Sequence, residues 1–175
     1  MEHTAHSNKN TEHTGHYGKL FFMVLFSFIA MYILMFAMAD SIKNVYPNIN
    51  QFYMAALMSM PMLVIELALM GKMYPNKKLN SFLIFLGSIG VVAFFLLIQF
   101  QTAVSDKQFL KGMIPHHSAA ILMSEQSKST DTAIQKLQSE IISSQKKEIE
   151  IMKTKLKEME SPHFYQIPQP KKQEN

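Results

Sequence analysis

Three long stretches with almost no charge constrain this chain more than any other feature of its sequence. Residues 20–39 and 82–100 contain no charged side chain, and residues 52–70 contain only Glu66. Each stretch is close to the ~20 residues that an α-helix needs to cross the hydrocarbon core of a bilayer. The sequence therefore predicts an all-α protein in which three membrane helices form a membrane domain over residues 20–100.

The first stretch could instead be a cleaved signal peptide, which has a short apolar core, a basic start and a small-residue cleavage site. Residues 20–39 are too long for such a core, follow a polar leader, and lead into Asp40 before two further apolar stretches. We therefore interpret the first stretch as a retained anchor.

The lysines near the apolar stretches predict an orientation. One side carries Lys9, Lys19, Lys72, Lys77 and Lys78, and the other carries Lys43, Lys107 and Lys111. Because cytoplasmic loops carry the excess of positive charge, we expect three spans in the cytoplasmic membrane, in contact with lipid. The N-terminus would then lie inside and the C-terminal domain outside, in the periplasm.

The amino-acid composition excludes or disfavours several classes of function. The chain has no cysteine, so disulfides and thiolate metal sites are excluded. Its formal charge of +4 comes from dispersed lysines, so we expect no nucleic-acid partner. Methionine is unusually frequent at 15 residues, but methionine also serves as an ordinary flexible hydrophobe. Its placement, and not its abundance, has to carry any functional argument.

Residues 103–161 predict a helical hairpin outside the membrane domain. Ser105 followed by Gln108 is typical of a capping box, which predicts a helix over 105–126. A polar turn follows, and a second helix is expected over 131–160. Both helices are long enough to form a small packed unit.

The two ends of the chain carry weaker signals. The leader, residues 1–19, is polar and contains His3, His6, His13 and His16. These histidines could bind metal loosely or have no role, and the sequence leaves both readings open. Residues 162–175, which are rich in proline, are predicted to be disordered.

Polar residues interrupt the apolar seam of the second hairpin helix. At 100° per residue, the apolar residues within about 40° of Ile141 are Ile134, Leu137, Met152 and Met159. Gln145 and Glu148 fall on the same seam. Burying an unpaired carboxylate is costly, so we expect Glu148 to have a cationic or hydrogen-bonded partner.

The first hairpin helix offers that partner in a cluster of soft metal-binding side chains. Met113 is three residues from His116 and four from His117, so a thioether and an imidazole can point at one ion. Met123 lies about 10 Å further along the helix than His116. Pro115 cannot donate to the carbonyl of Lys111 and is expected to bend the helix.

Ligand chemistry selects copper. Thioether sulfur is soft and suits Cu(I) or Ag(I), imidazole suits zinc and copper in either oxidation state, and Mg²⁺ or Ca²⁺ would demand oxygen ligands. A single histidine on an apolar face is more often a satisfied core residue than a ligand. Two adjacent histidines flanked by methionine, opposite a seam with polar members, favour metal binding over packing.

These residues resemble a known family. Phe109 to Ser124, FLKGMIPHHSAAILMS, and Ile141 to Met152, IISSQKKEIEIM, are similar to the ferritin-like, copper-binding family known as domain of unknown function 305, over residues 106–160. The resemblance implies metal handling in or near the periplasm, and the membrane half resembles anchored members of that family. Position by position, it implies ligands at Met113, His116, His117, Met123, Gln145, Glu148 and Met152.

The same resemblance suggests a partner. Soluble relatives can carry the repeat twice and form four helices, whereas this chain carries it once. Two amphipathic helices cannot cover both of their seams, and the usual solution is a four-helix bundle. We therefore expect a homodimer through the hairpin, with copper shared between subunits.

The apolar stretches contain a second constellation. Its members recur at helical spacing: Met31, Met35, Met38, Met54, Met58, Met62 and Glu66. An intramembrane carboxylate is a functional hypothesis by default, so a methionine-lined path for Cu(I) is conceivable. The favoured alternative is that these methionines pack the bundle, while Glu66 reaches the interface or pairs with Lys72.

We expect a membrane-anchored copper-binding protein that sequesters or hands on copper and is not an enzyme. A copper exporter or chaperone would be its partner in delivery. The alternative is a small copper-transporting membrane protein that uses its Met-lined spans. A di-iron oxidase is disfavoured, because such sites need Glu-x-x-His pairs on bundle helices and neither predicted hairpin helix contains one.

Overall fold

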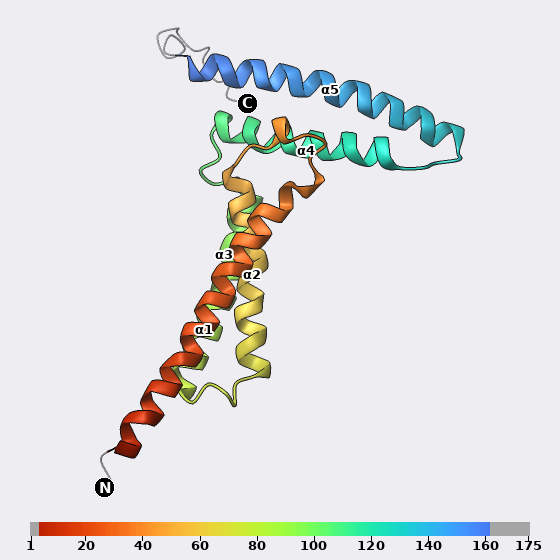
Figure 1. The fold of residues 1–175 in the computed structure, drawn as a ribbon. Helices are drawn as coiled ribbons and strands as arrows, with labels where there is room; N and C mark the ends of the chain where they lie inside the picture. The colour runs from red at the N-terminus through yellow and green to blue at the C-terminus, as the bar shows by residue number, and fades with distance from the viewer. Residues whose placement is uncertain (1–3, 162–175) are drawn as a thin grey trace. The chain divides into compact units, whose positions relative to one another are not determined.

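Every regular element in the described part of the chain is a helix, which confirms the all-α prediction. The computed structural model describes residues 4–161, with side chains described from His16 onward. The α-helices are α1 (Thr4–Leu34), α2 (Ile49–Leu69), α3 (Lys77–Gln99), α4 (Asp106–Gln126) and α5 (Thr132–Glu160) (Figure 1). Two 3-10 helices, η1 (Met35–Met38) and η2 (Ile42–Asn44), lie between α1 and α2. The segment 162–175, predicted to be disordered, lies outside the described residues.

The chain divides into two compact units. The first combines the described part of Met1–Ala37 with Ile49–Ala103, and therefore contains α1, α2 and α3. The second combines Met38–Asn48 with the described part of Val104–Asn175, and contains α4 and α5. The loop between α1 and α2 thus belongs to the hairpin unit.

Three helical segments are long and apolar enough to cross a membrane. They are His16–Met38, Ile49–Leu69 and Lys77–Gln99, in agreement with the predicted 20–39, 52–70 and 82–100. The polar leader is not a separate segment in this structure, because α1 begins at Thr4 and continues into the first apolar stretch.

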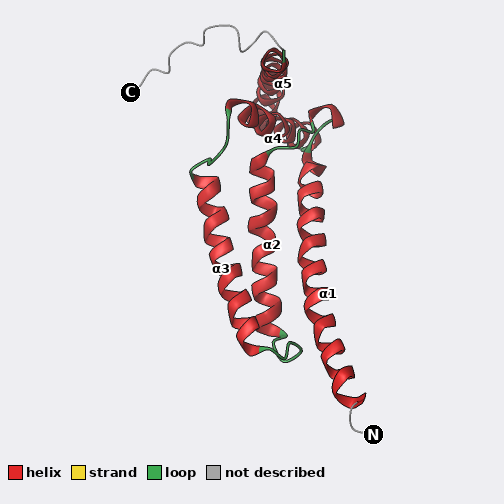
Figure 2. Ribbon diagram, turned by 90° about the vertical axis from the view of Figure 1, so that its left-hand side faces the viewer, coloured by secondary structure: helices red, strands yellow, loops and turns green. Residues whose placement is uncertain are grey.

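Helix α2 is the inner helix of the first unit and packs against both α1 and α3 (Figure 2). Small residues allow α2 and α3 to approach closely: a Cβ atom added at Gly87 of α3 would lie 2.9 Å from Val64 Cγ2. Ala55 and Ser59 of α2 are fully buried. Pro61 lies inside α2.

The second unit is the expected hairpin. Ser105 caps α4 by accepting a hydrogen bond from the Gln108 amide at 3.4 Å. Asp131 caps α5 by accepting from Ala133 and Ile134 amides at 2.8 and 3.1 Å. The core between the helices consists of Ile114, Ile121, Ile149 and Leu156.

The sequence prediction of the buried face of α5, which is centred on Ile141, is wrong. Ile134 and Leu137 are 48% and 54% exposed, whereas Ile149 and Leu156 are 3% exposed. Ile149 and Leu156 lie about 60–80° around the helix from Ile141. Helix α5 therefore packs with a face rotated from the seam, because its contact is determined by the surface of α4 and not by the densest apolar line on α5.

Candidate metal centre

Helix α4 carries the adjacent histidines on its boundary between core and solvent. Ile114 and Ser118 are fully buried and mark the core side of the helix. Met113 and His117 are half-buried and His116 is exposed. The rings of His116 and His117 are 6.1 Å apart and inclined at 59°. Of the two imidazoles, His117 is the one that contacts α5, at Glu148.

His117 meets Glu148 across the hairpin. Its Nδ1 lies 3.0 Å from Glu148 Oε2, with side-chain exposures of 13% for His117 and 49% for Glu148. Nδ1 is enclosed, yet the contact lacks hydrogen-bond geometry. Two donors bound to one ion at about 2.0–2.2 Å are about 3 Å apart when they meet it at right angles. The separation of the two atoms is therefore compatible with a metal ion between them.

Glu148 contacts His117 of α4, the helix expected to supply its partner, but without hydrogen-bond geometry, and Glu148 is not buried. Half of its side chain remains exposed, because it lies on the edge of the α5 face that packs on α4. Water therefore reduces the cost of its charge. A partly solvated carboxylate next to an enclosed imidazole nitrogen also gives an entering cation a path from the surface.

The other predicted positions on α5 lie close to the core. Met152 packs against the cluster of Ile114, Ile121, Ile149 and Leu156, and Gln145 is half-buried. Met152 follows Glu148 by one helical turn, so its thioether lies on the same side of α5.

The predicted ligand set is thus divided between two environments. Met113, His117, Gln145 and Met152 are half-buried, and Glu148 contacts His117. Met123 is 55% exposed and His116 is also exposed. Among the residues that the structure describes, no group of three or more His, Cys, Asp or Glu is arranged to hold a metal ion. The predicted ligands of other residue types are the thioethers of Met113, Met123 and Met152 and the amide of Gln145.

The second predicted constellation is not enclosed as a set. Met38, Met54 and Met58 are 48%, 39% and 46% exposed, while Met31, Met35, Met62 and Glu66 are half-buried. Glu66 Oε1 accepts a hydrogen bond from the Tyr74 hydroxyl at 3.2 Å. Within the described residues the partner of Glu66 is therefore Tyr74, and not the expected Lys72.

Tyr74 belongs to a polar cluster that sequence reasoning missed. The Tyr17 hydroxyl donates to Asn80 Oδ1 at 2.7 Å, and Asn80 Nδ2 donates to the Tyr74 carbonyl at 3.0 Å. Burial raises the pKa of Tyr74, and the hydrogen bond to Glu66 raises it further. These contacts join residues of α1, α2 and α3, which are far apart in the sequence. The one sequence signal for this cluster is that Tyr and Asn residues occur beside the apolar stretches.

The leader histidines are described only in part. His16 lies edge-on to Tyr74, with ring centroids 6.4 Å apart. His3 and the side chains of His6 and His13 lie outside the described residues, so both readings of the leader, loose metal binding and no role, stay open.

Comparison with known proteins gives two matches. The family model described as Domain of unknown function (DUF305) matches residues 96–171. The uncharacterized protein L153 of Acanthamoeba polyphaga mimivirus is 37% identical over 139 residues, which cover 78% of this chain and 90% of that protein. No solved structure matches the chain.

Proposed function

The chain belongs to the DUF305 family, and from that premise we propose that it is a membrane-anchored copper-binding protein. It sequesters or hands on copper at the outer face of the cytoplasmic membrane, as part of metal homeostasis or tolerance. Copper is its cargo, and it performs no reaction on it. The three apolar helices serve as the anchor.

The contact between His117 and Glu148 carries the proposal. It places an enclosed imidazole nitrogen 3.0 Å from a carboxylate oxygen, without hydrogen-bond geometry. Met113 and Met152 come from the same two helices and offer thioethers beside this pair. Thioethers need no deprotonation and prefer Cu(I), which favours copper over zinc or hard cations at this hairpin.

A second copy would complete the ligand set. His116 and Met123 are exposed, as are Ile134 and Leu137 of α5. In a twofold dimer the hairpins would form a ferritin-like four-helix bundle and cover these residues. Analytical ultracentrifugation in detergent tests this part of the proposal, and a copper-loaded monomer would contradict it.

Copper content of the purified full chain tests the proposal most directly. We expect the wild type to retain copper after gel filtration, and His116→Ala/His117→Ala to fall to background, because both imidazoles are lost. The matched control is His16→Ala, which removes a histidine from the other unit and should leave the copper content unchanged. Zinc or iron in place of copper, or full copper content in the double variant, would overturn the site.

The alternative function, copper transport by the apolar helices, makes a different prediction. Replacing Met58, Met62 and Glu66 would abolish copper flux into vesicles if those helices conduct the ion. Under our proposal the same variant keeps the copper content of the wild type. The bond from Tyr74 to Glu66 and the exposure of Met58 give transport no specific support.

A further inference from the structure

The loop between α1 and α2 is built into the hairpin unit. Residues 38–48 belong to the same compact unit as α4 and α5. Tyr46 packs against the hairpin core, and Asn44 and Asn48 are only 6% and 5% exposed. Such burial is unusual for polar loop residues, which ordinarily lie on the surface. The loop is therefore an integral part of the hairpin unit and packs with its helices.

One attachment pairs the backbone carbonyl that Pro115 leaves without a donor. Proline has no amide hydrogen, so the carbonyl of Lys111 loses its ordinary donor inside the helix. Unpaired backbone carbonyls are costly when they are buried. Asn48 Nδ2 donates to the Lys111 carbonyl at 3.4 Å and to the Tyr46 carbonyl at 3.0 Å. The loop thus supplies the donor that the helix lacks.

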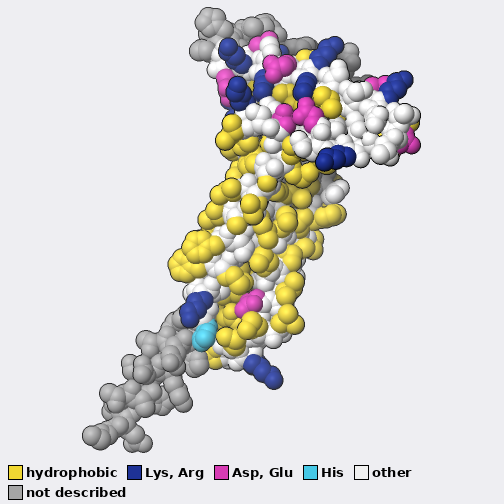
Figure 3. Space-filling view, turned by 45° about the vertical axis from the view of Figure 1, so that its right-hand side comes forward, with side chains coloured by type: hydrophobic (Ala, Val, Ile, Leu, Met, Phe, Trp, Pro, Cys, Tyr) yellow, Lys and Arg dark blue, Asp and Glu magenta, His cyan; other side chains and the backbone are white. Residues whose placement is uncertain are grey.

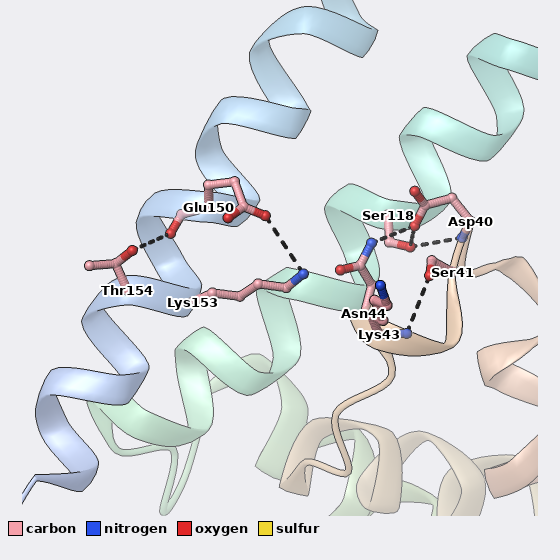
Figure 4. Close-up of polar contacts among 8 residues, drawn as sticks. All are labelled: Asp40, Ser41, Lys43, Asn44, Ser118, Glu150, Lys153 and Thr154. Carbon is pink, nitrogen blue, oxygen red and sulfur yellow. Dashed lines mark hydrogen bonds and ion pairs between the residues drawn. The ribbon is translucent and has the colours of Figure 1, made fainter.

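The other attachment holds the residue that follows His117. Ser118 is fully buried. Its Oγ accepts from the Asp40 amide at 2.8 Å and donates to the Asp40 carboxylate. Asn44 Nδ2 donates to the same carboxylate oxygen at 2.6 Å (Figure 4). A helical serine ordinarily bonds to a carbonyl of its own helix, whereas Ser118 bonds to the loop.

The two attachments bracket three of the four proposed ligands of α4, with Met123 lying beyond them. Lys111 precedes Met113, and Ser118 follows His117, so the turn that carries the thioether and both imidazoles is held at each end. We propose that the loop is the positioning element of the metal centre, acting through Asp40 and Asn48. These two residues do not touch the metal. The geometry of this inference is independent of copper, but its consequence for binding rests on the proposed function.

Charge supports the attachment at Asp40. Partial burial raises the pKa of Asp40, but hydrogen bonds from Ser118 and Asn44, the backbone of Ser41 and the charge of Lys153 together lower it below the ordinary 3.8. The carboxylate therefore stays ionised at neutral pH and accepts both side-chain hydrogen bonds. Figure 4 shows Asp40, Ser41 and Asn44 beside Ser118 of α4, with Lys153 on α5.

Amide hydrogen exchange on the metal-free full chain in detergent tests the geometry. Asp40→Ala and Asn48→Ala should each speed exchange in residues 111–118 about three- to tenfold, the effect of losing a typical hydrogen bond. Exchange in residues 132–144 of α5 should not change. Lys43→Ala, in the same loop, is the matched control. Unchanged exchange in 111–118 would overturn the positioning role.

Copper affinity tests the consequence. In competition with a chromophoric Cu(I) chelator, Asp40→Ala and Asn48→Ala should bind about tenfold more weakly, the usual effect of losing a residue that orients a metal ligand. Asp40→Asn keeps the carbonyl acceptor, so it should stay within about twofold of wild type and exclude general unfolding as the cause.

The outcomes separate the two proposals. Faster exchange with unchanged copper affinity would overturn the role of the loop in the metal centre. A wild type that binds no copper would instead overturn the proposed function. In that case the exchange result alone would still decide whether the loop holds the turn.

Discussion

The two units of this protein differ in the exposure of their large apolar side chains. In the first, large apolar residues face outward: Phe85 is 64% exposed and Val92 is 57% exposed. In the second, Ile114 and Ile121 are buried to within 1% beneath a surface on which charged side chains gather (Figure 3). Both units are helical, so secondary structure does not account for the difference.

The comparison teaches which substitutions each unit can tolerate. In the hairpin, removal from water stabilises the structure, so the few buried residues carry it. Under the proposed membrane location, the first unit is surrounded by lipid tails, which are as apolar as leucine and give no such driving force between helices, so that close fit would determine its stability. We therefore expect the hairpin to lose stability when a buried side chain is shortened, and the first unit to lose stability when a small residue between its helices is enlarged.

The largest expected effect comes from the hairpin core. Ile121→Ala should lower the free energy of unfolding of the hairpin unit by about 2–5 kcal/mol, because it leaves a cavity in the core. Urea unfolding of the full chain in detergent, followed by circular dichroism, measures this loss. Ile151→Ala and Ile89→Ala, at residues 58% and 47% exposed, should change it by no more than about 0.5 kcal/mol. Equal losses of unfolding free energy for all three variants would show that burial does not determine the stability of the hairpin.

Close packing in the first unit gives the next effect. Gly87→Leu would place a Cβ 2.9 Å from Val64 Cγ2 and 3.4 Å from Leu63 Cδ2. Overpacking of this kind costs about 1–3 kcal/mol. Gly18→Leu is the matched control, since no atom lies within 4 Å of its Cβ. Denaturation in a graded detergent mixture would show the first variant unfolding early. A similar loss at Gly18 would contradict the role assigned to close fit.

The smallest expected effect concerns the attachment of Asp40 within the second unit, and it appears only at acidic pH. Because the folded pKa of Asp40 is lowered from 3.8, its contribution to stability is complete above that value and is lost as pH falls through the folded pKa. Lys153 is the charged group of α5 that acts on it. The side-chain amide NMR signal of Asn44 should therefore stay constant from pH 7 to pH 5 and shift below pH 3.8. An identical shift in Asp40→Asn would assign the change to another group.

Local signals explain why the elements could be predicted from the sequence. Uncharged length predicts the three apolar helices, and caps predict the starts of α4 and α5: Ser105 and Asp131 bond the amides of their own first turns. The contact of His117 with Glu148 joins two consecutive helices of one hairpin, both of which the sequence predicts. These features depend on residues that are close in the sequence or on adjacent elements.

The remaining features depend on distant residues. The buried face of α5 includes Ile149 and Leu156 because α4 fits there, and no periodicity of α5 alone gives that rotation. Asp40 and Asn48 reach α4 from a loop that precedes two apolar helices. One signal pointed to such a partner: Pro115 within a helix leaves the Lys111 carbonyl in need of a donor.

That need has a consequence for protein engineering. A designer who transplants the segment Lys111 to Ser118 into a helix of another scaffold also transplants a carbonyl without a donor and a hydroxyl without its acceptor. A recipient helix would have to replace Pro115, or present an amide and a carboxylate from a neighbouring strand or loop. The minimal transferable module is therefore discontinuous in sequence, and it includes residues 40–48.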